Sequence, residues 1–393
     1  MKNVPLGDIA TLVRGVSFSK EEGSLLPLEG HLPVIRAGSI QASLLLREGQ
    51  IWVPSDKIKS TQKIRIDDIV MCTSSGSSDL VGKCARSTED FDGSFGAFCV
   101  GIRADQEKAS PSYLYHFLCS PVFKNWTSAS SGANIKNIRV SELAEFQVPL
   151  PPLPEQKHIA AILDKADAIR RKRQQAIQLA DDFLRAVFLD MFGELVTSSG
   201  YANSQKYKLL ELVDYIDYRG KTPEKSESGI PLITAKNVKS GYVDDEPREY
   251  IPEENYDAWM TRGFPRKNDV LFTTEAPLGN VALLGEYEKV AIGQRLVALR
   301  SKGKVTHEYL LFLLLHPFIQ DLICARSSGS TVKGIRTKEL YAIELPVPDM
   351  QKQREFSAVY WKSKSLRSNQ ESAHQLDVLN FSALSQKAFA GQL

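Results

Sequence analysis

Residues 130–143 read SSGANIKNIRVSEL, and residues 327–340 read SSGSTVKGIRTKEL. The two stretches share eight residues in the same order, including Lys136 with Lys333 and Arg139 with Arg336. Similarity continues outward at a comparable spacing: LPVIRAGSI (32–40) matches IPLITAKNV (230–238), RIDDIVM (65–71) matches RKNDVLF (266–272), and SPSYLYHFLCSPVF (110–123) matches VTHEYLLFLLLHPFI (305–319). So many matches in one order indicate a tandem duplication.

Each copy has two parts. The first part, residues 1–154 or 193–351, contains short apolar and β-branched runs between Gly, Ser and Asp turns, which predicts a mixed α/β domain. A short helix is expected late in each domain, over 111–119 and 306–315. A proline stretch then ends the domain, PLPPLP at 149–154 and PVPD at 346–349, because proline neither continues a strand nor enters a helix interior.

The second part of each copy, residues 155–192 or 352–393, is predicted to be one long helix. An apolar stripe on one such helix is usually explained by ordinary core packing. Two stripes at the repeat spacing, each after a proline stop, instead predict an antiparallel coiled coil within the chain. The residues expected in this seam, and in the docking of partners, are Ile159, Ile162, Leu163, Ile177, Leu184, Phe356, Val359, Leu366, Leu376 and Leu379.

The expected fold is therefore α+β, with two similar mixed α/β domains separated by two long helices and related by a pseudo-two-fold internal repeat. Several other classes of protein are not expected. The five cysteines have no paired spacing and the six histidines no metal-ligand spacing, so neither a disulfide framework nor a metal site is expected. Residues 309–315 form the longest apolar run, far below the ~20 residues that span a bilayer. A cytoplasmic protein without a membrane segment is expected.

Charge is nearly balanced, with 49 Lys+Arg against 47 Asp+Glu and a net charge of +2. Residues 1–154 carry 16 basic and 16 acidic residues, and residues 193–351 carry 20 and 22. This balance does not resemble a protein that coats polyanions, whose affinity rests on many phosphate contacts. If nucleic acid is the ligand, a few groups that read base edges must provide much of the discrimination.

Two loops at equivalent repeat positions differ in chemistry, as expected of a surface that reads a ligand. The first offers Ser74, Ser75, Ser77, Ser78 and Lys83, and the second offers Thr273, Thr274 and Glu275, joined by Gln294 and Arg295. Ser and Thr can address several bases, Gln suits adenine and Arg suits guanine. A solvated loop without a ligand is the alternative. The first loop is not a phosphate-binding loop, because five residues separate its glycines and Cys84 replaces the Mg²⁺-binding Ser/Thr.

Lysines 136 and 333 recur in both copies and are expected to contact phosphate, which carries no sequence information. A structural turn that merely repeats with the fold is the alternative. The run 170–173 (RRKR) fits a solvated helix face, a DNA backbone contact or an acidic partner. Other residues assigned to the nucleic-acid surface are Arg14, Arg36, Asn134, Arg219, Lys221, Lys236 and Asn237.

Three segments, VPLPPLPEQKHIAAILDKADAI (148–169), LRAVFLDMFGE (184–194) and LSQKAFAGQL (384–393), resemble the specificity subunit of bacterial type I restriction–modification systems. The resemblance covers essentially the whole chain. The second copy departs from the pattern where Glu155-Gln156 becomes Lys352-Gln353.

The resemblance implies that each domain is a target recognition domain for one half of a split, asymmetric site in double-stranded DNA. It implies that the helices set the spacer and dock two modification (methyltransferase) subunits, with restriction subunits as further partners. The chain itself would be non-catalytic, and S-adenosylmethionine, ATP and Mg²⁺ would bind to the partner subunits only.

Two alternatives come from other classes. One is a stand-alone DNA-modifying enzyme with its own recognition domains, against which the missing glycine-rich cofactor loop and N/D-P-P-Y/F tetrapeptide argue. The other is a coiled-coil scaffold whose globular domains bind proteins.

Overall fold

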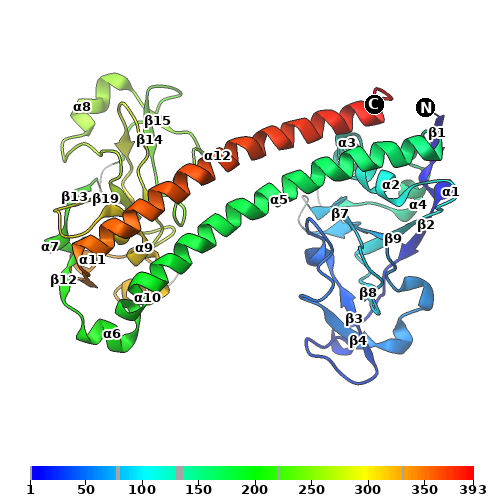
Figure 1. Ribbon diagram of the computed structural model, residues 1–393, viewed down its shortest axis with the longest axis horizontal. Helices are drawn as coiled ribbons and strands as arrows, with labels where there is room; N and C mark the ends of the chain where they lie inside the picture. Colours follow the sequence, from blue (N-terminus) through cyan, green and yellow to red (C-terminus); the bar gives the residue numbers. More distant parts are fainter. Residues whose placement is uncertain (1, 77–79, 130–135, 219–221, 330–331) are drawn as a thin grey trace. The chain divides into compact units, whose positions relative to one another are not determined.

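The computed structural model describes residues 2–76, 80–129, 136–218, 222–329 and 332–393 (Figure 1). The chain divides into two compact units: unit 1, which comprises Met1–Gln175 and Ser372–Leu393, and unit 2, which comprises Ala176–Glu371. Two helices of 40 residues, α5 (Leu153–Phe192) and α12 (Met350–Phe389), each contribute one segment to both units. Both begin two residues before the predicted start. In α5 this places Pro154 in the first turn, where proline is accepted.

Unit 1 contains a four-stranded antiparallel sheet and a three-stranded sheet. The first has the strand order β2-β9-β5-β7, and the second has the order β4-β3-β8, in which β3 runs parallel to β8. Their strands are β2 (Ala10–Arg14), β3 (His31–Ile35), β4 (Ile51–Pro54), β5 (Ile69–Cys72), β7 (Cys84–Arg86), β8 (Ser94–Phe95) and β9 (Cys99–Ala104). Two short antiparallel pairs join β1 (Lys2–Pro5) to β11 (Gln147–Leu150) and β6 (Ser74–Ser75) to β10 (Lys136–Asn137).

Unit 2 repeats this topology. Its four-stranded sheet has the order β13-β19-β16-β17, and its three-stranded sheet has the order β15-β14-β18, with β14 parallel to β18. The strands are β12 (Lys206–Lys208), β13 (Val213–Asp217), β14 (Ile230–Ile233), β15 (Tyr250–Ile251), β16 (Val270–Thr273), β17 (Val281–Leu283), β18 (Ala291–Ile292), β19 (Leu296–Ser301) and β20 (Glu344–Pro346). Strands β12 and β20 pair as β1 and β11 do. The predicted duplication is confirmed.

The helices recur in the same order. Unit 1 has α1 (Leu6–Ile9), α2 (Pro111–Leu118), α3 (Pro121–Ala129) and α4 (Val140–Glu145). Their counterparts in unit 2 are α7 (Leu209–Leu212), α9 (His307–Leu315), α10 (Pro317–Ala325) and α11 (Thr337–Tyr341), and this unit adds α6 (Ser198–Asn203) and α8 (Tyr256–Trp259). Single 3-10 turns lie at Lys20–Glu22, Ala37–Ser39, Ser55–Lys57, Ser60–Gln62, Gly193–Val196 and Glu253–Asn255.

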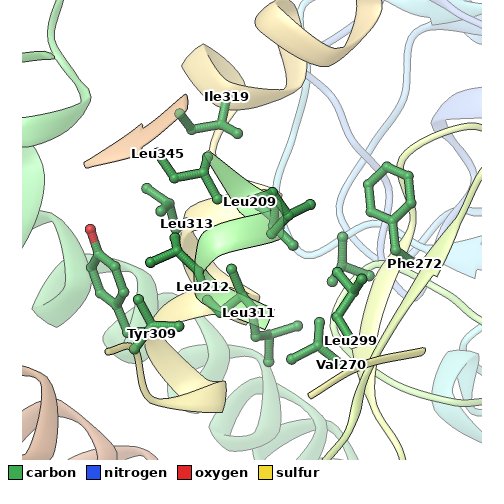
Figure 2. Packing of buried hydrophobic residues seen from close by; sticks show 14 of the residues in the cluster. Leu209, Leu212, Val270, Phe272, Leu299, Tyr309, Leu311, Leu313, Ile319 and Leu345 are labelled. Carbon is green, nitrogen blue, oxygen red and sulfur yellow. The ribbon is translucent and has the colours of Figure 1, made fainter. Parts of the chain in front are cut away.

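The larger hydrophobic core of unit 2 lies between its four-stranded sheet and its helices (Figure 2). Leu209, Phe272 and Leu313, from α7, β16 and α9, are fully buried. Tyr309 is fully buried as well, and its hydroxyl donates to the Pro346 carbonyl at 2.9 Å. Burial raises the pKa of this hydroxyl far above its ordinary value, so the group remains a donor. In unit 1, the Tyr113 hydroxyl makes the equivalent bond to the Pro149 carbonyl at 2.6 Å.

A buried glutamine joins each domain to the helix that follows it. Gln156 accepts a hydrogen bond at Oε1 from the Ser110 N–H at 2.9 Å. Its Nε2 donates to the carbonyls of Lys108 and Pro151 at 3.1 and 2.8 Å. Gln353 makes the same three bonds with the corresponding backbone groups of unit 2. A buried amide with every partner present explains why glutamine recurs in both copies.

The two long helices run antiparallel to each other inside each unit, as predicted. In unit 1, Arg173 bonds to Asp377 at 2.6 Å, and the Arg170 guanidinium lies 5.1 Å from the centre of the Phe381 ring. In unit 2, Asp181 pairs with Arg367 at 2.5 Å, and the rings of Phe188 and Phe356 are 5.5 Å apart. In both units the partner numbers on α12 fall as those on α5 rise.

The composition of this seam differs from the prediction. Five of the ten predicted residues are buried: Ile159, Leu163, Ile177, Leu184 and Phe356. Ile162 and Val359 are half-buried. Leu366, Leu376 and Leu379 are instead 59, 61 and 66% exposed, so their assignment to the seam is wrong. The inward positions in the middle of α12 carry polar residues such as Arg367 and Asp377, which pair across the helices, and the leucines lie on another face.

The basic run 170–173 is largely used inside unit 1. Arg170 and Arg171 both bond to Asp167 at 2.6 Å, and Arg173 bonds to Asp377. Three of its four cations are therefore paired within the unit, which favours a structural role over a fully solvated face.

Within the described parts of the chain, no single helix has the length and apolarity needed to cross a membrane. Helices α9 and α10 meet that criterion only as a pair, across a bend of 70°. Leu310, Leu311 and Ile319 of this pair lie in the core of unit 2.

Candidate nucleic-acid interface

The four-stranded sheet of unit 1 brings several of the predicted residues to one edge. Because neighbouring strands run antiparallel, the ends of β2 and β5 lie beside the starts of β9 and β7. Arg14 ends β2, Ser74 and Ser75 follow β5, Lys83 precedes β7 and Phe98 precedes β9. These five residues are exposed or half-exposed. We call them the strand-end surface of unit 1.

A polar hollow of about 500 Å³ opens at the corresponding edge of unit 2. Its walls come from the ends of β16 and β19 and from the segment before α11. The lining residues are Thr274, Glu275, Gln294, Arg295, Ser328, Val332, Gly334, Ile335 and Arg336. We call Glu275, Gln294, Arg295, Ser328 and Arg336 the strand-end surface of unit 2. The sheet topology thus places Glu275, Gln294 and Arg295, predicted from separate stretches of sequence, around one hollow.

An exposed ion pair lies in this hollow. Arg295 Nε bonds to Glu275 Oε1 at 2.9 Å, and the two side chains are 50 and 46% exposed. The Thr222 hydroxyl donates to Gln294 Oε1 at 3.2 Å. An exposed ion pair contributes only about 0–1 kcal/mol, so another acceptor can replace Glu275 at low cost. A guanine edge suits the Arg295 fork, and an adenine edge suits the Gln294 amide.

The repeated segments before α4 and α11 reach the same edges. Gly334 pairs with Glu275 as an isolated antiparallel bridge. Lys333, one residue earlier, is exposed beside the hollow. In unit 1 the backbone of Lys136 pairs with that of Ser75. The two lysines thus occupy equivalent positions next to the strand-end surfaces.

Three predicted contact residues are corrected by the structure. Thr273, Thr274 and Asn237 are 0, 2 and 2% exposed. The threonine hydroxyls donate to the carbonyls of Asn280 and Arg295 at 3.4 and 3.3 Å, and the Asn237 amide donates to two backbone carbonyls at 3.0 Å. These side chains do not face a ligand, because their polar groups are buried and bond to backbone carbonyls inside unit 2.

Three other predicted cations already have partners within their units. Arg36 donates to the Gly49 carbonyl at 3.3 Å, Lys236 lies 3.4 Å from Glu249, and Lys83 donates to Gln41 at 2.9 Å. Arg36 and Lys236 follow strands of the three-stranded sheets, so they do not join the strand-end surfaces. Ser77, Ser78, Asn134, Arg219 and Lys221 lie outside the described residues.

Sequence reasoning missed Phe98 and Arg336 as site residues. Arg336 lines the hollow of unit 2, and its counterpart Arg139 recurs in the most similar stretch of the two copies. That recurrence was the available signal. Phe98 is 68% exposed, and a phenylalanine in an apolar run is ordinarily assigned to a core. Among the described residues, no group of three or more His, Cys, Asp and Glu could hold a metal ion.

The type I restriction modification DNA specificity domain family matches this chain over residues 1–179 and 202–359. The chain belongs to this family. It is 28% identical over 371 residues to the EcoKI specificity subunit of Escherichia coli K12, covering 89% of this chain and 79% of that protein. It is 38% identical over 188 residues to the StySPI specificity subunit of Salmonella potsdam, covering 47% of this chain and 40% of that protein.

Solved structures show the same fold. The S subunit of a type I restriction–modification system from M. genitalium has a TM-score of 0.59 at 16% identity and covers 99% of this chain and 96% of that one. A chain from a structure on complex assembly and conformational transition of the type I R-M system has a TM-score of 0.53 at 20% identity, with 100 and 98% covered. The family match identifies a DNA-recognition subunit of the type I restriction–modification class, not a stand-alone enzyme or a scaffold.

Proposed function

We propose that this chain chooses the DNA sequence on which a type I restriction–modification complex acts, with unit 1 reading one half of a split site and unit 2 the other. The observation that carries the proposal is the pair of strand-end surfaces. Both are supported by the same strand topology, but one carries Ser74, Ser75 and Phe98, and the other carries Glu275, Gln294 and Arg295. Two unlike surfaces on one repeated framework suit an asymmetric site.

The proposed contacts divide into two kinds. Gln294 and Arg295 read base edges of one half-site, and Ser74 and Ser75 contribute to the other. Lys136 and Lys333 bind phosphate and position the DNA without reading it. The near-neutral charge of the chain, +2 overall, fits a protein whose partner subunits supply further affinity for DNA.

The long helices set the spacing of the two half-sites and dock two modification subunits. Each helix of 40 residues is about 60 Å long at 1.5 Å per residue. Methylation and cleavage belong to partner subunits, including restriction subunits, and so do S-adenosylmethionine, ATP and Mg²⁺. The chain itself is non-catalytic and works in the cytoplasm on double-stranded DNA.

Methylation mapping of a host with and without this gene tests the proposal. We expect one asymmetric, two-part motif to lose its methylation when the gene is deleted and to regain it on complementation. A continuous or palindromic motif, or an unchanged methylation pattern, would contradict the proposal. Purified chain that methylates DNA without any partner subunit would contradict its non-catalytic role.

A further inference from the structure

The turn that precedes β9 in unit 1 has a close counterpart before β19 in unit 2. In unit 1, the Gly96 N–H donates to the Ile35 carbonyl at 2.9 Å, and the Cys99 N–H donates back to Gly96 at 2.9 Å. In unit 2, Gly293 bonds to Ile233 at 2.8 Å, and Leu296 bonds back to Gly293 at 3.2 Å. Phe98 therefore occupies the position that Arg295 occupies in the other copy.

The backbone at this position is held firmly in both units. The Phe98 carbonyl accepts hydrogen bonds from the Thr73 N–H at 2.8 Å, the Thr73 hydroxyl at 3.1 Å and the Ser74 N–H at 3.2 Å. The Arg295 carbonyl accepts from the N–H and the hydroxyl of Thr274 at 3.0 and 3.3 Å. Both threonines are buried. The backbone is therefore held in the same way in both copies, and only the side chain at this position differs.

The Phe98 side chain projects into solvent. It is 68% exposed although its neighbours Phe95 and Cys99 are 1 and 2% exposed. Single exposed apolar residues are common on protein surfaces and need no explanation. Phe98, however, lies beside Ser74 on the strand-end surface of unit 1. Its equivalent in unit 2 is Arg295, which lines the polar hollow.

We propose that Phe98 is a specificity-determining residue of unit 1 and that it contacts the C5-methyl group of a thymine in the major groove. This inference rests on the proposed function. A phenyl ring cannot hydrogen-bond a base edge, and the apolar feature that a base pair presents in the major groove is the thymine methyl. Because the backbone is already fixed, little conformational freedom is lost when DNA binds.

The test uses the full chain assembled with its modification subunits. A duplex that it prefers is first selected from a random pool, and each thymine of the half-site assigned to unit 1 is then replaced by deoxyuridine, which lacks the methyl. We expect one replacement to weaken wild-type binding about fourfold, equivalent to the ~0.8 kcal/mol of one buried methyl-sized group. Phe98→Ala should bind both duplexes equally, whereas Phe98→Leu should keep part of the difference.

Two control variants locate the effect. Arg295→Ala should relax the other half-site and keep the thymine–uracil difference. Leu26→Ala, which alters another exposed apolar residue of unit 1 (72% exposed), should leave both affinities unchanged. Thermal unfolding should be unaltered in Phe98→Ala, because the side chain is not part of the core.

Three results would overturn the inference while leaving the proposed function intact. One is a selected half-site whose affinity depends on no thymine methyl. Another is uniform weakening of all duplexes by Phe98→Ala. The third is Phe98-dependent fluorescence of 2-aminopurine in the site, which would show a wedge that unstacks the bases. If the wild-type complex selects no sequence at all, the proposed function fails, and this inference fails with it.

Discussion

At the scale of single residues, the site of unit 2 depends on a contrast between Arg295 and Lys333. Arg295 forms an ion pair with Glu275 at 2.9 Å in the hollow, whereas Lys333 is an exposed cation next to the hollow. A guanidinium can form two directed bonds to one guanine, but an ammonium interacts with phosphate as a compact charge. Removal of Arg295 is therefore expected to reduce sequence discrimination, and removal of Lys333 is expected to reduce the affinity for all DNA sequences.

Arg295→Ala should cost about 1–3 kcal/mol on the preferred duplex and relax one position of the motif. Lys333→Ala should weaken all duplexes alike and reduce the slope of log K against log salt by about one. Titrations at several salt concentrations, on the preferred duplex and on single mismatches, measure both effects. Lys267→Ala, which removes an exposed lysine paired with Glu286 before the start of β16, is the matched control. The opposite pattern would mean that the two roles are reversed.

A second residue-scale prediction concerns Gln156. Gln156→Ala leaves the buried Ser110 N–H and two carbonyls without their partner, which should lower the free energy of unfolding by about 1–3 kcal/mol. Urea unfolding of the full chain measures the loss. Gln351→Ala, which changes an exposed glutamine on α12, should unfold like the wild type. Equal stability of the two variants would show that the buried bonds contribute nothing.

At the scale of elements, the two long helices are joined by charge as well as by apolar contact. Asp181 and Arg367 pair at 2.5 Å with each side chain 29% exposed. Asp181→Lys should destabilise unit 2 by roughly 1–2 kcal/mol, less than the 3–5 kcal/mol of a fully buried pair. Adding Arg367→Asp should restore part of this loss, because the pair with residue 181 is re-formed with exchanged charges, whereas the bond of Arg367 to Glu371 at 2.8 Å is lost. Denaturant unfolding gives the free energy of unfolding of the single and double variants. If the losses of the two single variants simply add in the double variant, the two residues do not form a stabilising pair.

The outward leucines of α12 lead to a different expectation. Leu376 and Leu379 are 61 and 66% exposed, and each would gain about 1.5–3 kcal/mol on complete burial against a partner subunit. The double variant Leu376→Ser/Leu379→Ser should therefore copurify poorly with the modification subunit while its own unfolding is unchanged. Leu25→Ser, at an exposed leucine of a loop, serves as the control. Normal assembly of the double variant would show that partners dock elsewhere.

The repeat was predictable from the sequence, whereas the helix seam was predictable only in part. The repeat predicted two similar mixed α/β domains, each followed by a long helix, but not the strand order of their sheets. Gln156 and Gln353, which recur in the sequence, also recur with the same contacts. The helix seam was predicted only in part. A search for apolar spacing finds Leu366, Leu376 and Leu379 but cannot detect that Arg367 and Asp377 face inward with partners on α5.

For the site, the sequence predicted several of the residues but neither their contacts nor their burial. Arg295 and Glu275 lie 20 positions apart in sequence, and their contact required the β16–β19 pairing to be known. Thr273 and Thr274 looked like surface groups because they adjoin a polar loop, although their hydroxyls bond to backbone carbonyls in the interior. Whether a short polar side chain at a strand end is exposed depends on the next strand, which local sequence does not specify.

At the scale of the whole molecule, recognition should be modular. Each unit has its own sheets, core and strand-end surface. Replacing residues 1–154 with the same segment of another specificity subunit should change one half of the methylated motif and preserve the other. Methylation mapping of a host that carries the hybrid measures this. A change in both halves, or in neither, would show that the units do not read DNA independently.

The end of α12 completes the core of unit 1, and this has a consequence for the order of synthesis. Ala388 is fully buried there, and the ring of Phe389 lies 5.5 Å from Tyr113 and 5.1 Å from Phe117. On the ribosome, residues 176–371 must be made before these contacts can form, roughly 10–40 s at about 5–20 residues per second. Unit 2 can thus fold before the first-made unit is finished. A nascent chain released early would expose aromatic surface to chaperones and proteases. The core of unit 1 is therefore complete only in chains in which both recognition units have been translated.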